Sequence, residues 1–125
     1  MKAIQTPNAP QPAGHYAQAI VHDGLVYVSG QLPIDPRTGG RCTGSIEEQA
    51  QRALENVAAI LEAAGSRADL VLKTTVYVSD IRLWGRVNAV YAAFFGDHRP
   101  ARAVVPSREL HYGLLVEIEA VAALA

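Results

Sequence analysis

The sequence predicts a single α+β domain over residues 1–125, with a mixed sheet and two helices in the order ββαβαββ. Two segments carry apolar residues at helical spacing, and five shorter segments alternate or are rich in β-branched residues. Two helices are too few to cover both faces of a five-stranded sheet. We therefore expect both helices on one face.

The chain begins with a Pro- and Asn-containing stretch through Pro12, which we expect to be irregular or to lie at a sheet edge. Two strand-like runs follow, Ala17–His22 and Leu25–Ser29, on either side of Asp23-Gly24. Asp-Gly between such runs predicts a hairpin, because the tight turn needs positive φ angles. The next residues, 30–40, are dense in turn formers and predict a shaped loop.

The first helix is predicted at about Ser45–Ala64. Ser45 and Glu48 form a capping-box pattern at its start, and Gly65 stands where a left-handed C-terminal cap belongs. A second helix is predicted at about Ile81–Phe95, with Gly96 near its end.

Three further strands are predicted at Leu70–Ser79, Ala101–Val105 and Leu114–Leu124. The last two are expected to form a hairpin through residues 109–113. In the final strand one face is wholly apolar, whereas the other mixes apolar residues with Glu117 and Glu119. Such a mixed face is too apolar for open water and too polar for a dry core. We therefore expect it to meet another subunit across an interface with polar pockets.

Composition and charge disfavour several classes of function and several locations. The net charge is −1, which disfavours a nucleic-acid binder that acts by phosphate neutralisation, so no nucleic-acid partner is expected. The single cysteine, Cys42, fits a reducing compartment. There is no signal-like apolar segment at the N-terminus and no apolar run long enough to span a membrane. The prediction is a cytoplasmic protein without a membrane partner.

Five segments resemble the RidA/YjgF family of enamine/imine deaminases, across essentially the whole chain. They are GHYAQA at 14–19, SGQLPIDPRTG at 29–39, KTTVYVSD at 73–80, VNAVYAAFFG at 87–96 and PARAVVPSRELHYGLLVEIEA at 100–120. The resemblance implies a chorismate-mutase-like fold and a homotrimer with clefts between subunits. It also implies hydrolysis of reactive 2-imino or 2-enamino acids, such as 2-aminoacrylate, to 2-keto acids and ammonia. No cofactor or metal is implied.

Two residues would carry that chemistry. Arg102 matches the family's carboxylate-binding arginine, and a guanidinium holds a carboxylate through two hydrogen bonds while staying charged. Glu117 matches the first glutamate of Glu-Ile-Glu and can orient the attacking water and accept its proton. The alternative for Arg102 is an ordinary surface arginine, and that for Glu117 is a partner of Lys73 or of another basic group on the same sheet face.

Four other positions are expected to bind substrate. Tyr16, Ser29 and Asn88 match residues that line the family's cleft, and Gly30 offers bare backbone to a ligand. Each of the three side chains has a simpler interpretation as a polar group that finds a hydrogen bond in the fold.

The chain departs from the commonest family pattern at two of the positions that bear on the site. Val104 replaces a frequent cysteine two residues after Arg102, where the backbone amide can still serve a substrate carboxylate. His15 replaces the proline of Gly-Pro-Tyr and adds a titratable group beside the cleft. These departures indicate a side branch of the family, whose preferred imine is left open.

Two other functions fit parts of the pattern. A binding trimer that holds small carboxylates or keto acids would use Arg102 and leave Glu117 catalytically idle. An endoribonuclease or translation inhibitor, a label that some family members carry, has little support, since there is no basic stripe and no histidine pair arranged for acid–base cleavage. The other histidines and Cys42 show no metal-ligand spacing, so no metal site is predicted.

Overall fold

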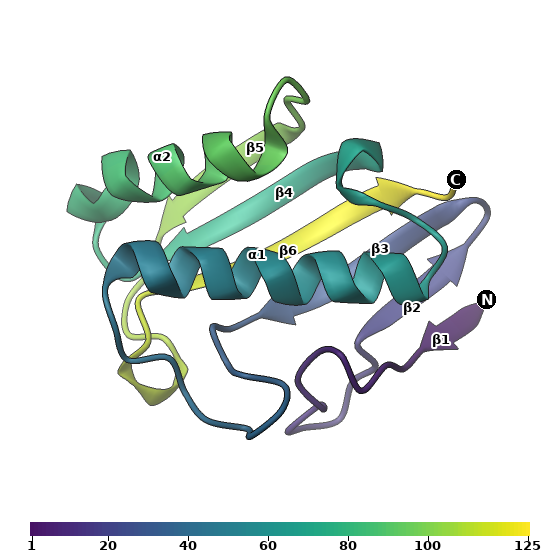
Figure 1. The fold of residues 1–125 in the computed structure, drawn as a ribbon, viewed down its shortest axis with the longest axis horizontal. Helices are drawn as coiled ribbons and strands as arrows, with labels where there is room; N and C mark the ends of the chain where they lie inside the picture. Colours follow the sequence, from purple (N-terminus) through teal and green to yellow (C-terminus); the bar gives the residue numbers. More distant parts are fainter.

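The computed structural model describes residues 1–125 as a two-layer α+β fold, in which both helices cover the same face of one sheet (Figure 1). The sheet has six strands in the order β1-β2-β3-β6-β4-β5; β4 and β5 are parallel and all other neighbours are antiparallel. The elements are β1 Lys2–Ile4, β2 Ala19–His22, β3 Leu25–Gln31, α1 Ile46–Ala63, β4 Val71–Val78, α2 Trp84–Phe95, β5 Ala101–Pro106 and β6 Val116–Ala123.

The predicted ends of α1 are confirmed. The Glu48 N–H donates to Ser45 Oγ over 3.2 Å, which is one half of the expected capping box. At the other end Gly65 has a φ of 84°, and the Ser66 N–H donates to the Leu61 carbonyl over 2.8 Å. That pair of features is a Schellman cap, which stops the helix where the sequence indicated.

The hairpin between β2 and β3 is confirmed as well. Asp23 and Gly24 have φ angles of 50° and 77°, and His22 pairs directly with Leu25. The two-residue turn therefore uses positive φ at both central positions, as the Asp-Gly pair requires.

The sheet differs from the prediction in two ways. The N-terminal stretch lies at a sheet edge, as one of the two expectations for it stated, but it adds a sixth strand, β1, that pairs with β2; three residues are too few for a strand periodicity to show. The predicted β5–β6 hairpin does not form, because β4 lies between these strands. Instead β4, α2 and β5 form a strand–helix–strand unit with parallel strands.

The predicted faces of the final strand are correct. In β6 the residues Val116, Ile118, Ala120 and Ala122 are buried under the helices, while Glu117 and Glu119 are half-buried on the open face. In β4 the alternation breaks near its start, where the register shifts between Val71 and Lys73. That irregularity buries Val71 and exposes Leu72, out of step with the alternation from Thr74 to Val78.

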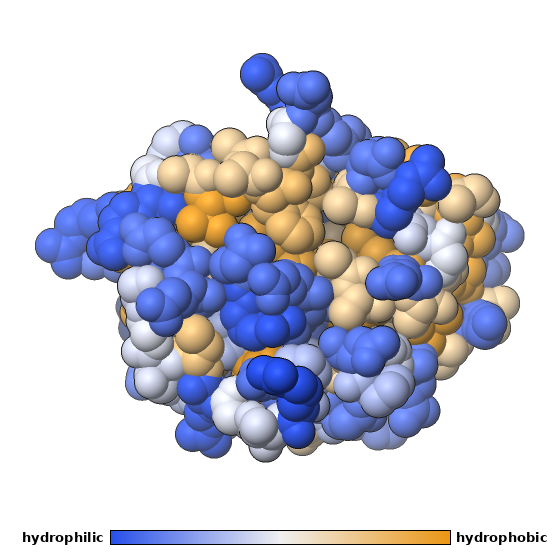
Figure 2. Space-filling model, in the orientation of Figure 1, coloured by the Kyte–Doolittle hydropathy of each residue, from blue (hydrophilic) through white to orange (hydrophobic).

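The hydrophobic core of 22 buried residues lies between the helices and the sheet. Figure 2 views the molecule from the helix side, with hydrophilic side chains over the middle of α1 and a paler, more apolar surface toward α2. The helices do not include a segment that is both long and apolar enough to cross a bilayer.

Three fully or almost fully buried amide side chains hold loops at one end of the sheet. Gln18 Oε1 accepts from the Thr6 N–H over 2.7 Å, and its Nε2 donates to carbonyls of the N-terminal segment. Asn56 Nδ2 donates to the carbonyls of Leu32 and Ile34 over 3.1 and 2.9 Å. Gln49 Oε1 accepts from the Leu115 N–H over 2.9 Å. The loops are thus fixed from the core rather than by their own exposed side chains.

Candidate active site

Arg102 lies on the edge strand β5 and is held on several sides by α2. Its Nη1 donates to Asn88 Oδ1 over 2.9 Å, and its Cζ lies 4.7 Å from the ring centroid of Tyr91 and 5.6 Å from that of Trp84. A cavity of about 400 Å³ contains Asn88, Tyr91 and Arg102 in its lining. Stacking on aromatic faces leaves the guanidinium edge available for a planar anion.

Val104 stands beside Arg102 on the same strand, and its backbone faces the free edge of the sheet. The Ser107 N–H donates to the Val78 carbonyl on β4 over 2.7 Å. Because strand amides alternate in direction, the amides of residues 103 and 105 face β4, whereas those of Arg102 and Val104 point away from it. Pro106, which has no N–H, occupies the next outward position, as an edge strand allows. The Arg102 guanidinium and the free Val104 amide therefore lie at the same edge of the sheet.

Glu117 lies in a different cavity, of about 470 Å³, together with Tyr16, Ser29 and Gly30. A register shift in β3 between Val28 and Gln31 forms a bulge that contains Ser29 and Gly30. A Cβ on Gly30 would lie 2.9 Å from Glu117 Oε2 and 3.1 Å from Glu117 Cδ. Glycine at this bulge therefore leaves the space that the carboxylate occupies.

Tyr16 and Ser29 already make hydrogen bonds within the chain. Ser29 Oγ donates to the Ala17 carbonyl over 2.6 Å, so its hydroxyl ties β3 to the segment before β2. Tyr16 is largely exposed, and its hydroxyl accepts from the Ala13 N–H over 3.3 Å. Both residues line the cavity of Glu117.

The Glu117 carboxylate has no hydrogen bond or ion pair within the chain, including with Lys73. Burial raises the pKa of this carboxyl above its ordinary value, and the neighbouring Glu119 adds to the rise, whereas His111 lowers it. Glu119 itself accepts a hydrogen bond from the Tyr77 hydroxyl over 2.8 Å. The two glutamates of Glu-Ile-Glu thus differ: one is bonded and the other is free to exchange a proton.

Within one chain Arg102 and Glu117 do not converge. Arg102 is in register with Thr74, which is buried under α2 and hydrogen-bonded to Tyr91. Glu117 is in register with Tyr77 on the open face. Neighbours in register share a sheet face, so the side chains of Arg102 and Glu117 lie on opposite faces, with β4 between their strands. The two cavities have no lining residue in common.

The predicted site residues therefore form two groups. Tyr16, Ser29, Gly30 and Glu117 line one cavity, while Asn88 and Arg102 line the other, with Val104 next to Arg102 on β5. His15 is exposed and lies outside both linings.

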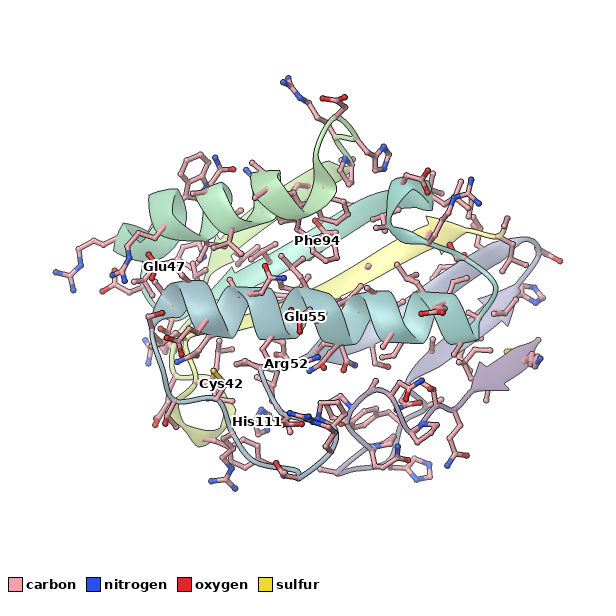
Figure 3. The ribbon with its side chains drawn as sticks, viewed as in Figure 1. Cys42, Glu47, Arg52, Glu55, Phe94 and His111 are labelled. Carbon is pink, nitrogen blue, oxygen red and sulfur yellow. The ribbon has the colours of Figure 1, made fainter.

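Sequence reasoning missed four residues around these two groups. The rings of Tyr91 and Trp84 flank Arg102, and Tyr91 also lines its cavity. His111 and Tyr112 line the Glu117 cavity from the loop between β5 and β6. Figure 3 shows His111 at the end of the sheet where the loop with Cys42 also lies.

Cys42 itself belongs to a separate surface hollow beside α1. The chain has no group of three or more His, Cys, Asp or Glu side chains that could bind a metal ion.

Known proteins resemble this chain over nearly its whole length. The family model described as "Endoribonuclease L-PSP" matches residues 6–124. A RutC family protein of Pyrococcus horikoshii is 46% identical over 97% of this chain and 96% of its own. The 2-iminobutanoate/2-iminopropanoate deaminase of Salmonella typhimurium is 44% identical over 97% of this chain and 96% of its own.

Solved structures agree with the sequence matches. The YjgF gene product of E. coli superposes with a TM-score of 0.94 at 40% identity, covering 98% of both chains. E. coli TdcF, solved with bound serine, superposes with a TM-score of 0.95 at 36% identity, covering all of both chains. The fold, the family model and the relatives agree, and the chain belongs to the RidA/YjgF family.

Proposed function

We propose that this protein hydrolyses 2-imino acids, and the 2-enamino acids that tautomerise to them, to 2-keto acids and ammonia. The observation that carries the proposal is the unpartnered, half-buried Glu117 carboxylate with its raised pKa, in a chain that also presents an ordered arginine at a free sheet edge. Relatives at 43% and 44% identity are named 2-iminobutanoate/2-iminopropanoate deaminases, which supports this chemistry.

Each group has a task in such a reaction. Arg102, with the Val104 amide, binds the substrate carboxylate through charge-assisted hydrogen bonds. Glu117 accepts a proton from water as the water oxygen bonds to the C=N carbon. When the imine nitrogen is protonated, this addition gives a neutral carbinolamine, which takes the same proton back from Glu117 on nitrogen. The C–N bond then breaks and ammonia leaves, while the hydroxyl proton passes to Glu117 and on to ammonia as the carbonyl of the 2-keto acid forms. A carboxyl with a raised pKa suits both steps, because its ionised form is a stronger base than an ordinary carboxylate and its protonated form can return the proton.

We further propose that the working site is shared between subunits of a homotrimer, with the Arg102 group of one subunit facing the Glu117 group of the next. The opposite-face arrangement supports this, since one chain cannot bring the two side chains to one small substrate. The open sheet face also exposes apolar side chains, with Tyr27 and Val105 at 47% and 37% of their surface. Contact with another copy would bury them.

The first test is acceleration of keto-acid release from freshly generated 2-aminoacrylate. The variant Arg102→Ala should lose about a hundredfold or more of the acceleration, because charge-assisted hydrogen bonds to the carboxylate are worth on the order of 3 kcal/mol. The control Arg82→Ala removes an exposed arginine that pairs only with Asp80 and should keep wild-type rates. Wild-type acceleration by Arg102→Ala would overturn the assignment. Binding of 2-keto acids without any turnover by the wild type would favour a non-catalytic binding trimer.

The shared site has its own test. Arg102→Ala and Glu117→Gln are each expected to be inactive alone, but a mixture refolded together should regain activity. Random mixing leaves about one site in four with both intact groups, when each site joins two neighbouring subunits of a ring. Hybrid oligomers that form and stay inactive would show that both groups must come from one chain. Light scattering gives the subunit number independently.

A further inference from the structure

Tyr112 has an unusual backbone at the rim of the Glu117 cavity. Its φ and ψ are 62° and 17°, in the left-handed region that glycine adopts readily and other residues rarely. The next residue is Gly113, also with a positive φ of 70°. A tyrosine at such a position costs conformational free energy that a glycine would not. Strain of this kind is concentrated at ligand-binding sites, where the surrounding structure enforces it.

A cation on a neighbouring loop holds the Tyr112 ring in place. The Cζ atom of Arg41 lies 3.6 Å from the ring centroid, a close cation–π contact. Arg41 is itself fixed, since it forms an antiparallel bridge with Ile34. The Ile34 carbonyl accepts a hydrogen bond from the buried Asn56 of α1 over 2.9 Å. The ring is therefore connected to the core through two ordered loop residues.

Tyr112 lines the same cavity as Glu117. Tyr112 remains 46% exposed although its ring is stacked, so part of it is available to a ligand. Tyr16 and Ile34 supply further apolar walls. The cavity of about 470 Å³ falls in the range of roughly 300–1,000 Å³ that is common for small-molecule sites. Its lining contains no lysine or arginine, so no permanently charged cation is present there for a second substrate carboxylate.

We propose that Tyr112, stacked on Arg41, is a specificity-determining residue that selects 2-imino acids with large apolar side chains, aromatic ones first. This inference rests on the proposed deaminase function and adds the substrate class. With the substrate carboxylate on Arg102 and the imine carbon near Glu117, the substrate side chain extends between Tyr16 and Tyr112. Aromatic rings pack favourably against such walls in offset or edge-to-face arrangements.

The test compares two imines, both made in the assay by an amino-acid oxidase, one from phenylalanine and one from alanine. The measured quantity is the ratio of their kcat/KM values. In Tyr112→Gly this ratio should fall roughly tenfold, because one aromatic wall is lost. Glycine suits the positive φ at this position, so the variant is expected to fold. Tyr112→Phe keeps the ring and should keep the ratio.

Arg41 provides a second variant with a matched control. Arg41→Gln leaves the Tyr112 ring in place but removes the cation stacked on it, so the ratio should fall less, by about threefold. Arg37→Gln removes a cation from the same loop, where Arg37 is exposed and pairs with Asp35. That control should leave the ratio unchanged.

The outcomes separate this inference from the proposed function. If the alanine-derived imine is accelerated and Tyr112→Gly leaves the ratio unchanged, the specificity role is wrong and the deaminase function stands. If neither imine is accelerated, the deaminase function is wrong. Calorimetry with phenylpyruvate and pyruvate then tests, without turnover, whether Tyr112 contacts an aromatic side chain of the ligand. If Tyr112→Gly binds phenylpyruvate more weakly but pyruvate equally well, the contact is supported. If phenylpyruvate binds equally well to both proteins, the contact is ruled out.

Discussion

The two cavities hold their charged groups in opposite ways. Arg102 is hydrogen-bonded to Asn88 and stacked on Tyr91, so its position is fixed before any ligand arrives. Glu117 has no such partner and lies in the space left by Gly30. The difference matches the two tasks in the proposed reaction. A group that binds a permanent anion gains from rigid support, whereas a group that exchanges protons must not have its charge fixed by a partner.

The largest effect is expected from filling the space beside Glu117. In Gly30→Ala the added Cβ would lie 2.9 Å from Glu117 Oε2, so the carboxylate must move. We expect kcat/KM for 2-aminoacrylate to fall about a hundredfold, since a displacement of about 1 Å at a reacting group can cost that much. Gly85→Ala in α2 is the control, because nothing lies within 4 Å of its added Cβ. Equal activity in both variants would mean that Glu117 needs no fixed position.

A smaller effect is expected from loosening Arg102. Asn88→Ala removes the acceptor of its 2.9 Å hydrogen bond but leaves the guanidinium stacked on Tyr91. We expect KM to rise by roughly tenfold with kcat little changed, since a hydrogen bond to a charged group is worth about 1.5–3 kcal/mol. Steady-state kinetics over a wide imine concentration separates the two constants. A fall in kcat at constant KM would instead assign Asn88 to the chemical step.

The smallest effect is a shift in pH dependence. Glu117 must be ionised to act as a base, and burial together with Glu119 raises its pKa above the ordinary 4.5. In Glu119→Gln the acid limb of kcat/KM should therefore move to lower pH. In His111→Gln it should move to higher pH, because His111 lowers the pKa of Glu117. Coincident limbs in all three proteins would show that another group sets the profile.

The raised pKa of Glu117 also makes the stability of the folded chain depend on pH. The pKa of this carboxyl is higher in the folded chain than in the unfolded one, so the folded chain binds the proton more tightly. The stability that this provides is present below pH 4.5 and is lost as the pH rises through the raised pKa of Glu117. Thermal unfolding of Glu117→Gln should lack this part of the pH dependence.

Local sequence signals predicted the parts of the fold that local physics determines. The Asp23-Gly24 turn and the caps at Ser45 and Gly65 were found because each depends on the φ preference or hydrogen bonding of a few adjacent residues. The order of strands was only partly found. No turn residue reveals that β4 separates β5 from β6, although the run of strand, helix and strand from Val71 to Pro106 favours a parallel pair.

The candidate site, like the strand order, depends on contacts between segments that are far apart in the sequence. Family resemblance named Arg102 and Glu117, but alternation within each strand does not show which face of the sheet a residue takes relative to a distant strand. Their placement on opposite faces needed the register of both strands with β4. The proposed role of Tyr112 could not be predicted either, because it depends on a positive φ and on a contact with Arg41, which is 71 positions earlier in the sequence.

The buried amides of Gln18, Gln49 and Asn56 also bear on how this family can diversify. They anchor the backbone of the loops around Glu117 from beneath, through bonds to main-chain atoms only. Exposed side chains on those loops, such as Arg41 and Tyr112, can therefore be exchanged by mutation without loss of the loop framework. New substrate ranges can therefore arise by the exchange of one rim residue at a time, while Glu117 and the amides that support its surroundings stay in place.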